Sequence, residues 1–261
     1  MQNYGALDFL PLWGLFGCTL ALVLLCVECG YRLGRYRHHV SAEEKPAPVS
    51  GMVEATLGLL AFLLAFTFGL AATKFDSRRQ LQLDEVNAIG TAYLRAELLP
   101  EGHDEIRGLL RQYVDANLDA MSPGKLEQSL RRCEELHGQL WARTTVIAEK
   151  NSGSVIVGLF VQALNDVIDL HAKRVALGLR SRIPGAIWAG LYSVAALALV
   201  VMGYHAGLEE TRRSLAVVAV AFAFSVVIWL IADLDRPQEG LLQVSQQGMV
   251  ELRNSIAEPK H

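Results

Sequence analysis

Two groups of polar residues could bind an ion if the fold brought them together. A helix would align the first group on one face, because its members are three or four residues apart: Asp84, Asn87, Thr91 and Arg95. The second group includes Asn165 and Asp169. Such faces are usually exposed to solvent and joined by local helical pairs. The alternative is a buried polar network, in which Asp84 and Asp169 would hold a cation or pair with Arg95.

Motifs for catalysis or for a metal site are weak. Glu134 and His137 form one Glu-x-x-His element, whereas carboxylate-bridged metal bundles use two copies on separate helices. Cys26 and Cys29 have the spacing of a metal-binding pair, but no second pair accompanies them. The sequence contains no phosphate-binding loop, no H-E-x-x-H motif and no G-x-S-x-G elbow. We therefore expect no enzymatic activity, no cofactor and no metal.

Four apolar stretches bear on whether the protein is soluble or spans a membrane. They cover residues 11–30, 56–73, 184–207 and 215–232, and a helix needs ~20 apolar residues to cross a bilayer. Tryptophan and tyrosine near several of the ends suit the membrane–water interface. The first stretch does not resemble a cleavable signal, because basic residues follow it instead of preceding it. The sequence predicts a multi-pass protein of the lipid bilayer.

The polar segment between the two apolar pairs is also predicted to be helical. Its apolar residues recur at helical spacing, and breaks occur at Pro100, at 122–124 and at 151–154. Four amphipathic helices of this kind pack most simply as an antiparallel bundle. The predicted fold is an all-α integral membrane protein, with four transmembrane helices and a juxtamembrane four-helix bundle inserted between the second and the third.

This pattern divides the chain into four parts. Residues 1–73 form the first transmembrane pair with a basic loop, residues 74–183 the bundle, residues 184–235 the second transmembrane pair, and residues 236–261 a short C-terminal tail. The net charge of -3 gives no reason to expect a nucleic-acid partner.

Charges near the membrane predict the orientation. The two short loops carry basic residues: Arg32, Arg35, Arg37, Lys45, Arg212 and Arg213. Because basic short loops stay in the cytoplasm, the bundle is expected on the extracytoplasmic side. Both ends of the bundle segment are basic as well, so the opposite orientation stays open.

The second apolar stretch carries two stripes at four-residue spacing. One stripe is smooth and would let another helix approach closely: Ala61, Ala65, Gly69 and Thr73. The other stripe is bulky and contains Phe62, Phe66 and Leu70. Aromatic rings in membrane helices usually face lipid or fill the protein interior. The alternative is that copies of this helix surround an axis, where the rings form a hydrophobic constriction that gates a pore by dewetting.

Three segments carry a family resemblance. They are FLLAFTFGLAATKFDSRRQLQLDEVNAIGTAYLRAELLP at 62–100, GYRLGR at 30–35 and, before RIPG, NDVIDLHAKR at 165–174. These segments look like the bacterial bestrophin-like membrane family, and the resemblance extends over nearly the whole chain. True bestrophins, which are remote relatives, are pentameric anion channels with a hydrophobic neck on the second membrane helix. The resemblance implies a homo-oligomer in a bacterial inner membrane, pentameric by analogy, with Phe62 and Phe66 at the neck.

The resemblance also bears on calcium. Bestrophins carry an acidic calcium clasp after the fourth membrane helix, whereas here Asp233 and Asp235 are followed by Arg236 and Pro237. We therefore do not expect gating by calcium.

The expected function is an anion channel for chloride or similar inorganic anions. Phe62, Phe66 and Leu70 would form the constriction, while Arg78 and Arg79 would attract anions near one mouth. The alternative is a membrane sensor or scaffold, whose bundle binds a ligand or a partner protein and transmits movement through the second membrane helix.

Overall fold

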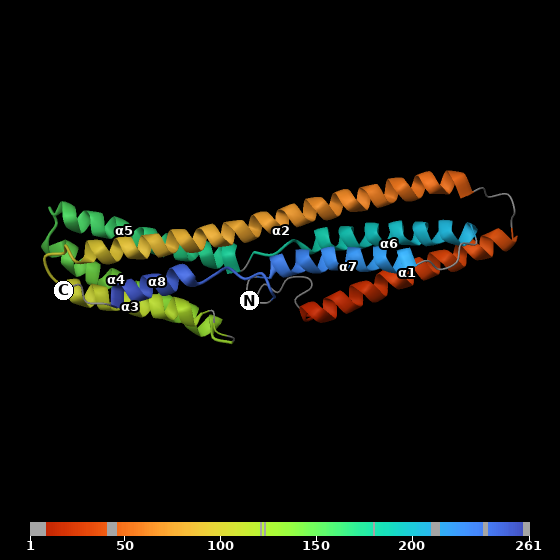
Figure 1. The fold of residues 1–261 in the computed structure, drawn as a ribbon. Helices are drawn as coiled ribbons and strands as arrows, with labels where there is room; N and C mark the ends of the chain where they lie inside the picture. The colour runs from red at the N-terminus through yellow and green to blue at the C-terminus, as the bar shows by residue number, and fades with distance from the viewer. Residues whose placement is uncertain are drawn as a thin grey trace. The chain divides into compact units, whose positions relative to one another are not determined.

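The computed structural model describes residues 9–40, 46–120, 122, 124–179, 181–209, 215–236 and 240–257 (Figure 1). Every regular element in these ranges is helical, which confirms the all-α prediction. The elements are α1 (Leu12–Val40), α2 (Pro46–Ala96), α3 (His103–Asp119), α4 (Leu126–Lys150), α5 (Val155–Lys173), the π-helical turn η1 (Arg174–Leu179), α6 (Gly185–Leu208), α7 (Leu215–Asp235) and α8 (Gln247–Ala257). Three loop residues used to predict the orientation, Lys45, Arg212 and Arg213, lie outside the described residues.

The chain forms two compact units. Unit 1 comprises residues 1–75 and 182–243, and unit 2 comprises residues 76–181 and 244–261. α2 is one uninterrupted helix that begins in unit 1 and ends in unit 2. The C-terminal residues, which the sequence analysis treated as a tail, contain α8. This helix packs against α3 in unit 2, because Met249 and Ile256 are buried in the core of that unit.

Five helical segments of the described chain have the length and composition to cross a membrane. They are Leu12–Val40, Val49–Ala96, Val155–Gly178, Gly185–Leu208 and Val218–Asp235. Four of them overlap the four expected spans and belong to unit 1, in full or, for α2, in part. The fifth is α5 with η1. Its side chains Phe160, Leu164 and Val167 are fully buried in the core of unit 2, whereas Val155, Ile156 and Leu159 are exposed, so packing in the bundle accounts for part of its apolar composition.

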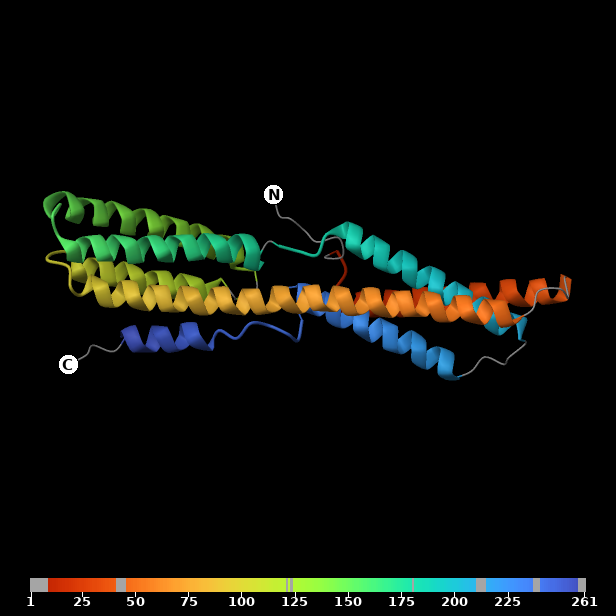
Figure 2. The same cartoon turned by 90° about the horizontal axis from the view of Figure 1, so that it is seen from above.

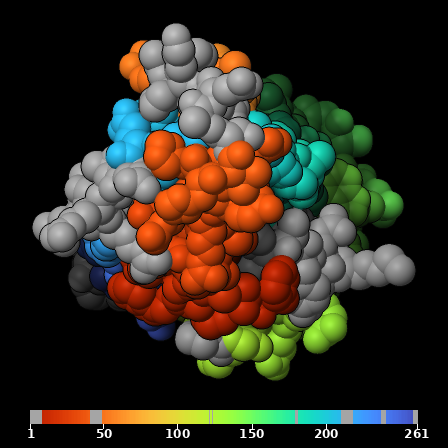
Figure 3. All heavy atoms as spheres, turned by 90° about the vertical axis from the view of Figure 1, so that its right-hand side faces the viewer, coloured from red at the N-terminus to blue at the C-terminus, as the bar shows by residue number. Residues whose placement is uncertain are grey.

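Unit 1 consists of α1, the first part of α2, α6 and α7. Its main core contains Leu60, Leu191 and Ile228, each almost completely buried. Figure 3 looks onto one end of this unit, with the C-terminal part of α1 (orange-red) in the middle. The first part of α2 also has exposed faces. Apolar side chains are exposed there, among them Met52 and Leu59. Exposed apolar side chains of this kind suit contact with lipid.

Two pairs of glycines let α1 and α6 cross at backbone contact. They are Gly30 and Gly34 on α1 and Gly203 and Gly207 on α6. A Cβ atom on Gly30 would overlap the carbonyl oxygen of Val200, and one on Gly203 would overlap that of Val27. Small residues four positions apart are a common device for close helix packing in membranes. The sequence analysis missed this crossing, because it used the glycines of GYRLGR only for the family resemblance.

Three of the four tryptophans belong to unit 1. Trp13 of α1 lies against Trp229 of α7, with 5.5 Å between the ring centroids. Trp188 of α6 is buried, and its ring centroid lies 6.3 Å from that of Tyr192. Trp141 is the exception, since it is exposed on α4 in unit 2.

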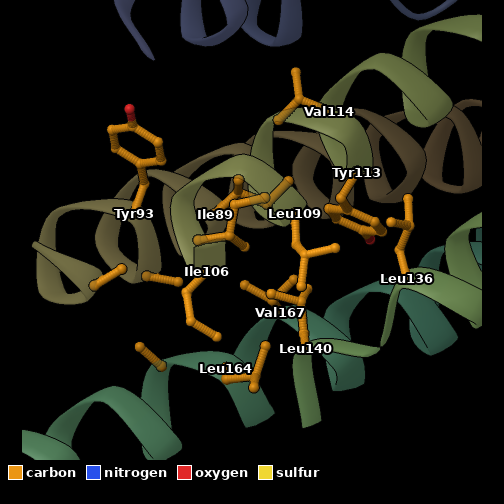
Figure 4. Close-up of a cluster of buried hydrophobic side chains, with 14 of the residues drawn as sticks. Ile89, Tyr93, Ile106, Leu109, Tyr113, Val114, Leu136, Leu140, Leu164 and Val167 are labelled. Atoms are coloured by element: carbon orange, nitrogen blue, oxygen red, sulfur yellow. The ribbon is translucent and has the colours of Figure 1, made fainter. Parts of the chain in front are cut away.

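Unit 2 is a bundle of the second part of α2 with α3, α4, α5 and α8. α5 and α8 run along opposite sides of α2 (Figures 1 and 2). In the core, Ile89 of α2, Leu109 of α3, Leu140 of α4 and Val167 of α5 meet (Figure 4). Tyr93 differs, because its hydroxyl points away from these side chains and donates to the carbonyl of Ile256, at 3.1 Å.

The turns of the bundle lie near the breaks predicted from the sequence. Gly102 and Gly124 have φ angles of 70° and 76°, a region that glycine adopts without strain. Ser154 caps α5, because its hydroxyl accepts a hydrogen bond from the backbone N–H of Val157.

Candidate functional site

The stripe predicted to form a constriction is on the surface of unit 1. Phe62 is 66% exposed and Phe66 is 58% exposed, while Leu70 is half-buried. On the opposite face of the helix, Leu60 and Leu64 are buried in the core. The core therefore orients α2 so that both phenylalanine rings face outward from unit 1.

The smooth stripe lies beside the phenylalanines and is also exposed. Its members are Ala61, Ala65, Gly69 and Thr73. A Cβ atom on Gly69 would meet no atom within 4 Å, which shows how much space this face leaves. This face is therefore open to lipid or to another helix.

The two arginines expected at a pore mouth have different surroundings. Arg79 is exposed, whereas Arg78 is only 7% exposed. The stem of Arg78 lies beside Gly178 of η1 in unit 2. The structure therefore separates a pair that the sequence analysis treated together, because adjacent residues of a helix point in different directions.

The structure does not bring the two predicted polar groups together. Four of the six residues are exposed: Asn87, Thr91, Asn165 and Asp169. Asp84 is half-buried and accepts a hydrogen bond from Gln80 at 2.9 Å. Arg95 donates to the backbone carbonyl of Leu159 at 2.7 Å. These residues lie on outer faces of the bundle, so they do not form a buried network.

A buried polar network does exist in unit 2, and it centres on Glu85, the residue after Asp84. Glu85 has no exposed surface. Its carboxylate accepts a hydrogen bond from the Tyr113 hydroxyl of α3 at 2.6 Å, and Nδ1 of His171 of α5 lies 3.3 Å away. Arg174 of η1 forms an ion pair with Glu85 through Nε and donates to the side-chain oxygen of Asn117 through Nη2. Three segments of the bundle thus converge on one carboxylate.

The geometry fixes the proton positions in this network. Glu85 carries a charge opposite to that of Arg174, so its carboxylate can only accept, and the short contact with Tyr113 requires the phenol to donate to it. Nδ1 of His171 lies 2.9 Å from the same phenol oxygen and 3.3 Å from Glu85. Since both neighbours can only accept from it, this nitrogen carries a hydrogen.

The network shifts the pKa values of its members. Burial alone would raise the pKa of Glu85, but the His171 hydrogen bond, the Arg174 charge and the Tyr113 hydroxyl outweigh it and hold that pKa below its ordinary value. Burial, together with the Glu85 charge, raises the pKa of Tyr113 well above its ordinary value. The network therefore pairs the Glu85 anion with the Arg174 cation, and the uncharged phenol of Tyr113 lies between α2 and α3.

Two α4 side chains complete this region. His137, identified in the sequence as a packed residue or a weak metal ligand, is 9% exposed, and its ring lies 4.8 Å from Tyr113 and 4.9 Å from His171 between centroids. Burial, and secondly the His171 charge, lower the pKa of His137 to about 4. Cys133 is completely buried, and burial raises the pKa of its thiol to about 12. Among the described residues no three His, Cys, Asp or Glu side chains are placed to hold a metal ion.

Acid should weaken the bundle through His137. Its pKa is lowered from 6.5 to about 4, so the unfolded chain takes up a proton that the folded chain excludes as the pH falls through this window. We expect about 3 kcal/mol of stability to be lost between pH 7 and pH 4 from this group. The His137→Leu variant should lack this part of the pH dependence, measured by chemical unfolding in detergent. An exposed control, His103→Leu, should keep the parental slope, and equal slopes for all three proteins would contradict the assignment.

The sequence does contain a signal for Glu85. The buried positions of α2 in unit 2 alternate four and three residues apart at Arg78, Gln82, Glu85, Ile89, Ala92 and Ala96, and Tyr93 beside Ala92 is buried as well. Leu83, which precedes Asp84, is 43% exposed and lies off this buried face. The polar face that begins at Asp84 is therefore displaced by one residue from the buried face, which contains Glu85.

The acidic residues at the end of α7 are engaged by protein groups. Asp233 is fully buried, and its carboxylate accepts hydrogen bonds from the backbone N–H groups of Leu241 at 2.9 Å and Leu242 at 3.0 Å. Asp235 accepts from the backbone N–H of Ile183 at 2.9 Å. These carboxylates hold neighbouring backbone in unit 1.

Comparison with known proteins identifies the family. The model of the Bestrophin-like domain matches residues 20–249, and no curated protein matches the chain significantly. Two crystal structures of a bacterial Bestrophin homolog from Klebsiella pneumoniae, each with a different point mutation, have similar folds. One has a TM-score of 0.67 at 14% identity and covers 93% of this chain and 99% of the homolog. The other has a TM-score of 0.63 at 16% identity and covers 90% and 94%. The chain belongs to the Bestrophin-like family, as the resemblance in its sequence indicated.

Proposed function

We propose that the chain forms a homo-oligomeric anion channel of a bacterial inner membrane, with four membrane spans and a constriction on α2. The family and the fold support this proposal, since true bestrophins are anion channels. The proposed partners are the lipid bilayer, further copies of the chain and chloride or similar inorganic anions.

The observation that carries the proposal is the unpartnered face of α2 in unit 1. Phe62 and Phe66 are exposed although the helix buries its other face in a core. If copies of α2 surround an axis, these rings form a hydrophobic ring that resists wetting and so controls ion passage. The smooth stripe at 61, 65, 69 and 73 gives a neighbouring helix room to approach.

We assign the attraction of anions near this constriction to Arg79. Its side chain is exposed, so its charge can act on ions in solution. Arg78 is buried in unit 2 and contributes to packing there. The sensor or scaffold remains the second candidate, because the buried network of the bundle could respond to a ligand.

Halide efflux from liposomes that contain the purified protein tests the proposal. The parent should conduct, and the Phe62→Ala/Phe66→Ala variant should raise the flux at least about threefold, because smaller side chains wet more easily. Phe68→Ala is the matched control, since Phe68 is also exposed on α2 but points in a different direction.

The outcomes separate the candidates. A folded, oligomeric parent without flux would exclude the channel and favour the sensor or scaffold. Equal flux changes in the double variant and in Phe68→Ala would place the constriction elsewhere.

A further inference from the structure

The π-helical turn η1 is attached to the bundle by buried charge. Arg174, its first residue, is 7% exposed and reaches both Glu85 of α2 and Asn117 of α3. Later in the turn, a Cβ atom on Gly178 would lie 3.5 Å from the stem of Arg174 and 3.7 Å from that of Arg78. A π-helical turn is less stable than an α-helical one and is frequent at functional sites. The turn therefore depends on the contacts of Arg174.

The polar and titratable groups around Glu85 and Arg174 come from four helices, α2, α3, α4 and α5. They are Tyr113 and Asn117 on α3, Cys133 and His137 on α4, His171 on α5, and Arg78 on α2, whose stem lies with that of Arg174 beside Gly178. Tyr113 and Cys133 stay uncharged at neutral pH, because burial raises the pKa of both. Glu85 is the anion that the hydrogen bonds and ion pairs of the described network place against Arg174.

Protonation of Glu85 or of His137 makes the net charge of the network more positive. A proton on Glu85 would leave Arg174 buried beside an uncharged partner, which is costly for a buried ion pair. A proton on His137 would add positive charge in the same region, 4.9 Å from the ring of His171. Both events weaken the attachment of η1.

We propose that the buried network of Glu85, His137 and Arg174 is an acid-sensitive latch, which holds η1 on the bundle at neutral pH and releases it when Glu85 and His137 take up protons. The chain passes from η1 to residue 182, the start of the next part of unit 1, within a few residues. Release would therefore free the backbone of η1, while Ile183, just before α6, stays bonded to Asp235. The latch is independent of the proposed channel, because its contacts lie in unit 2 alone.

Cys133 is a natural reporter for the latch. Its thiol is completely buried next to the network, and the raised pKa of about 12 keeps it protonated, so thiol reagents should modify it slowly. Replacing Cys18, Cys26 and Cys29 with alanine leaves Cys133 as the single thiol of the chain. All variants below are made in this background and measured in the full-length protein at pH 7.

Glu85→Gln imitates the protonated carboxyl without changing its size. We expect it to speed the labelling of Cys133 with N-ethylmaleimide at least about tenfold. Arg174→Met leaves Glu85 unpaired and should also speed labelling. The double variant removes both charges, so its rate should return toward that of the parent. Asp84→Asn is the matched control and should keep the parental rate, because Asp84 is half-buried outside the network and is bonded to Gln80.

Two results would overturn the latch. One is a parental labelling rate in Glu85→Gln, and the other is a double variant that labels faster than either single variant. Hydrogen exchange of the unmodified protein at pH 7 and near pH 3, below the lowered pKa of His137, is corrected for the intrinsic rate and tests the latch without any variant. Protection should be lost first in residues 171–179. Simultaneous loss across α3, α4 and α5 would mean that the whole bundle unfolds, and would also reject the latch.

Discussion

Replacing Gly203 with isoleucine should separate α1 from α6 and remove most of the folded protein. A Cβ atom at this position would overlap the backbone carbonyl of Val27, and backbone cannot move aside as a side chain can. The helices must therefore move apart, which also opens the contact at Gly207. Overpacking usually costs ~1–3 kcal/mol, and we expect a value above about 3 kcal/mol at this backbone contact.

The measurement is the monodisperse yield after detergent extraction, together with the thermal midpoint of whatever remains folded. Gly190→Ile is the matched control, because Gly190 lies on the same helix and a Cβ atom there would meet no atom within 4 Å. A Gly203→Ile protein with the yield and the midpoint of the control would show that α1 and α6 do not cross at these glycines.

Asp233→Ala should destabilise unit 1 by about 3 kcal/mol or more. The carboxylate is fully buried and accepts the N–H groups of Leu241 and Leu242, so its removal leaves two backbone donors without their acceptor. Hydrogen bonds to a charged group contribute ~1.5–3 kcal/mol each. Gly240→Ala should act on the same contact, because Gly240 has a φ of 106° and a Cβ atom there would overlap the Asp233 carboxylate.

Chemical unfolding in detergent micelles measures this effect. Gln243→Ala changes an exposed side chain of the same segment and should stay within about 0.5 kcal/mol of the parent. If Asp233→Ala matched Gln243→Ala, the segment that follows α7 would not be held by this carboxylate.

Local sequence signals were sufficient for most of the helical elements, although α8 lies in residues that were treated as a tail. The breaks at Pro100 and at 151–154 lie close to the ends of α2 and α4, where proline and glycine disfavour continuation of the helix. The apolar composition of the four expected spans is also evident from the sequence, because a helix that crosses a bilayer must be mostly apolar.

The sequence did not show which residues of different helices contact one another. The sequence offered a buried network at Asp84 only as the alternative to a solvent-exposed face, and the structure leaves Asp84 half-buried and buries Glu85 instead. A carboxylate is buried only where another element supplies donors, and Tyr113, His171 and Arg174 come from distant parts of the sequence. The glycines of α1 and α6 could have been paired by their equal four-residue spacing, but only if the two helices were known to be neighbours.

The distribution of the tryptophans gives the two units separate optical signals. Trp141 is the indole of unit 2, while the other three report on unit 1, and two of them, Trp13 and Trp229, lie close enough to share excitation energy. The tryptophan fluorescence of a Trp141→Phe protein would come from unit 1 alone. Lipids with brominated chains quench indoles by contact. Quenching of the Trp141→Phe protein would therefore report contact between unit 1 and the hydrocarbon, and the difference in quenching between the parent and this variant would report contact at Trp141.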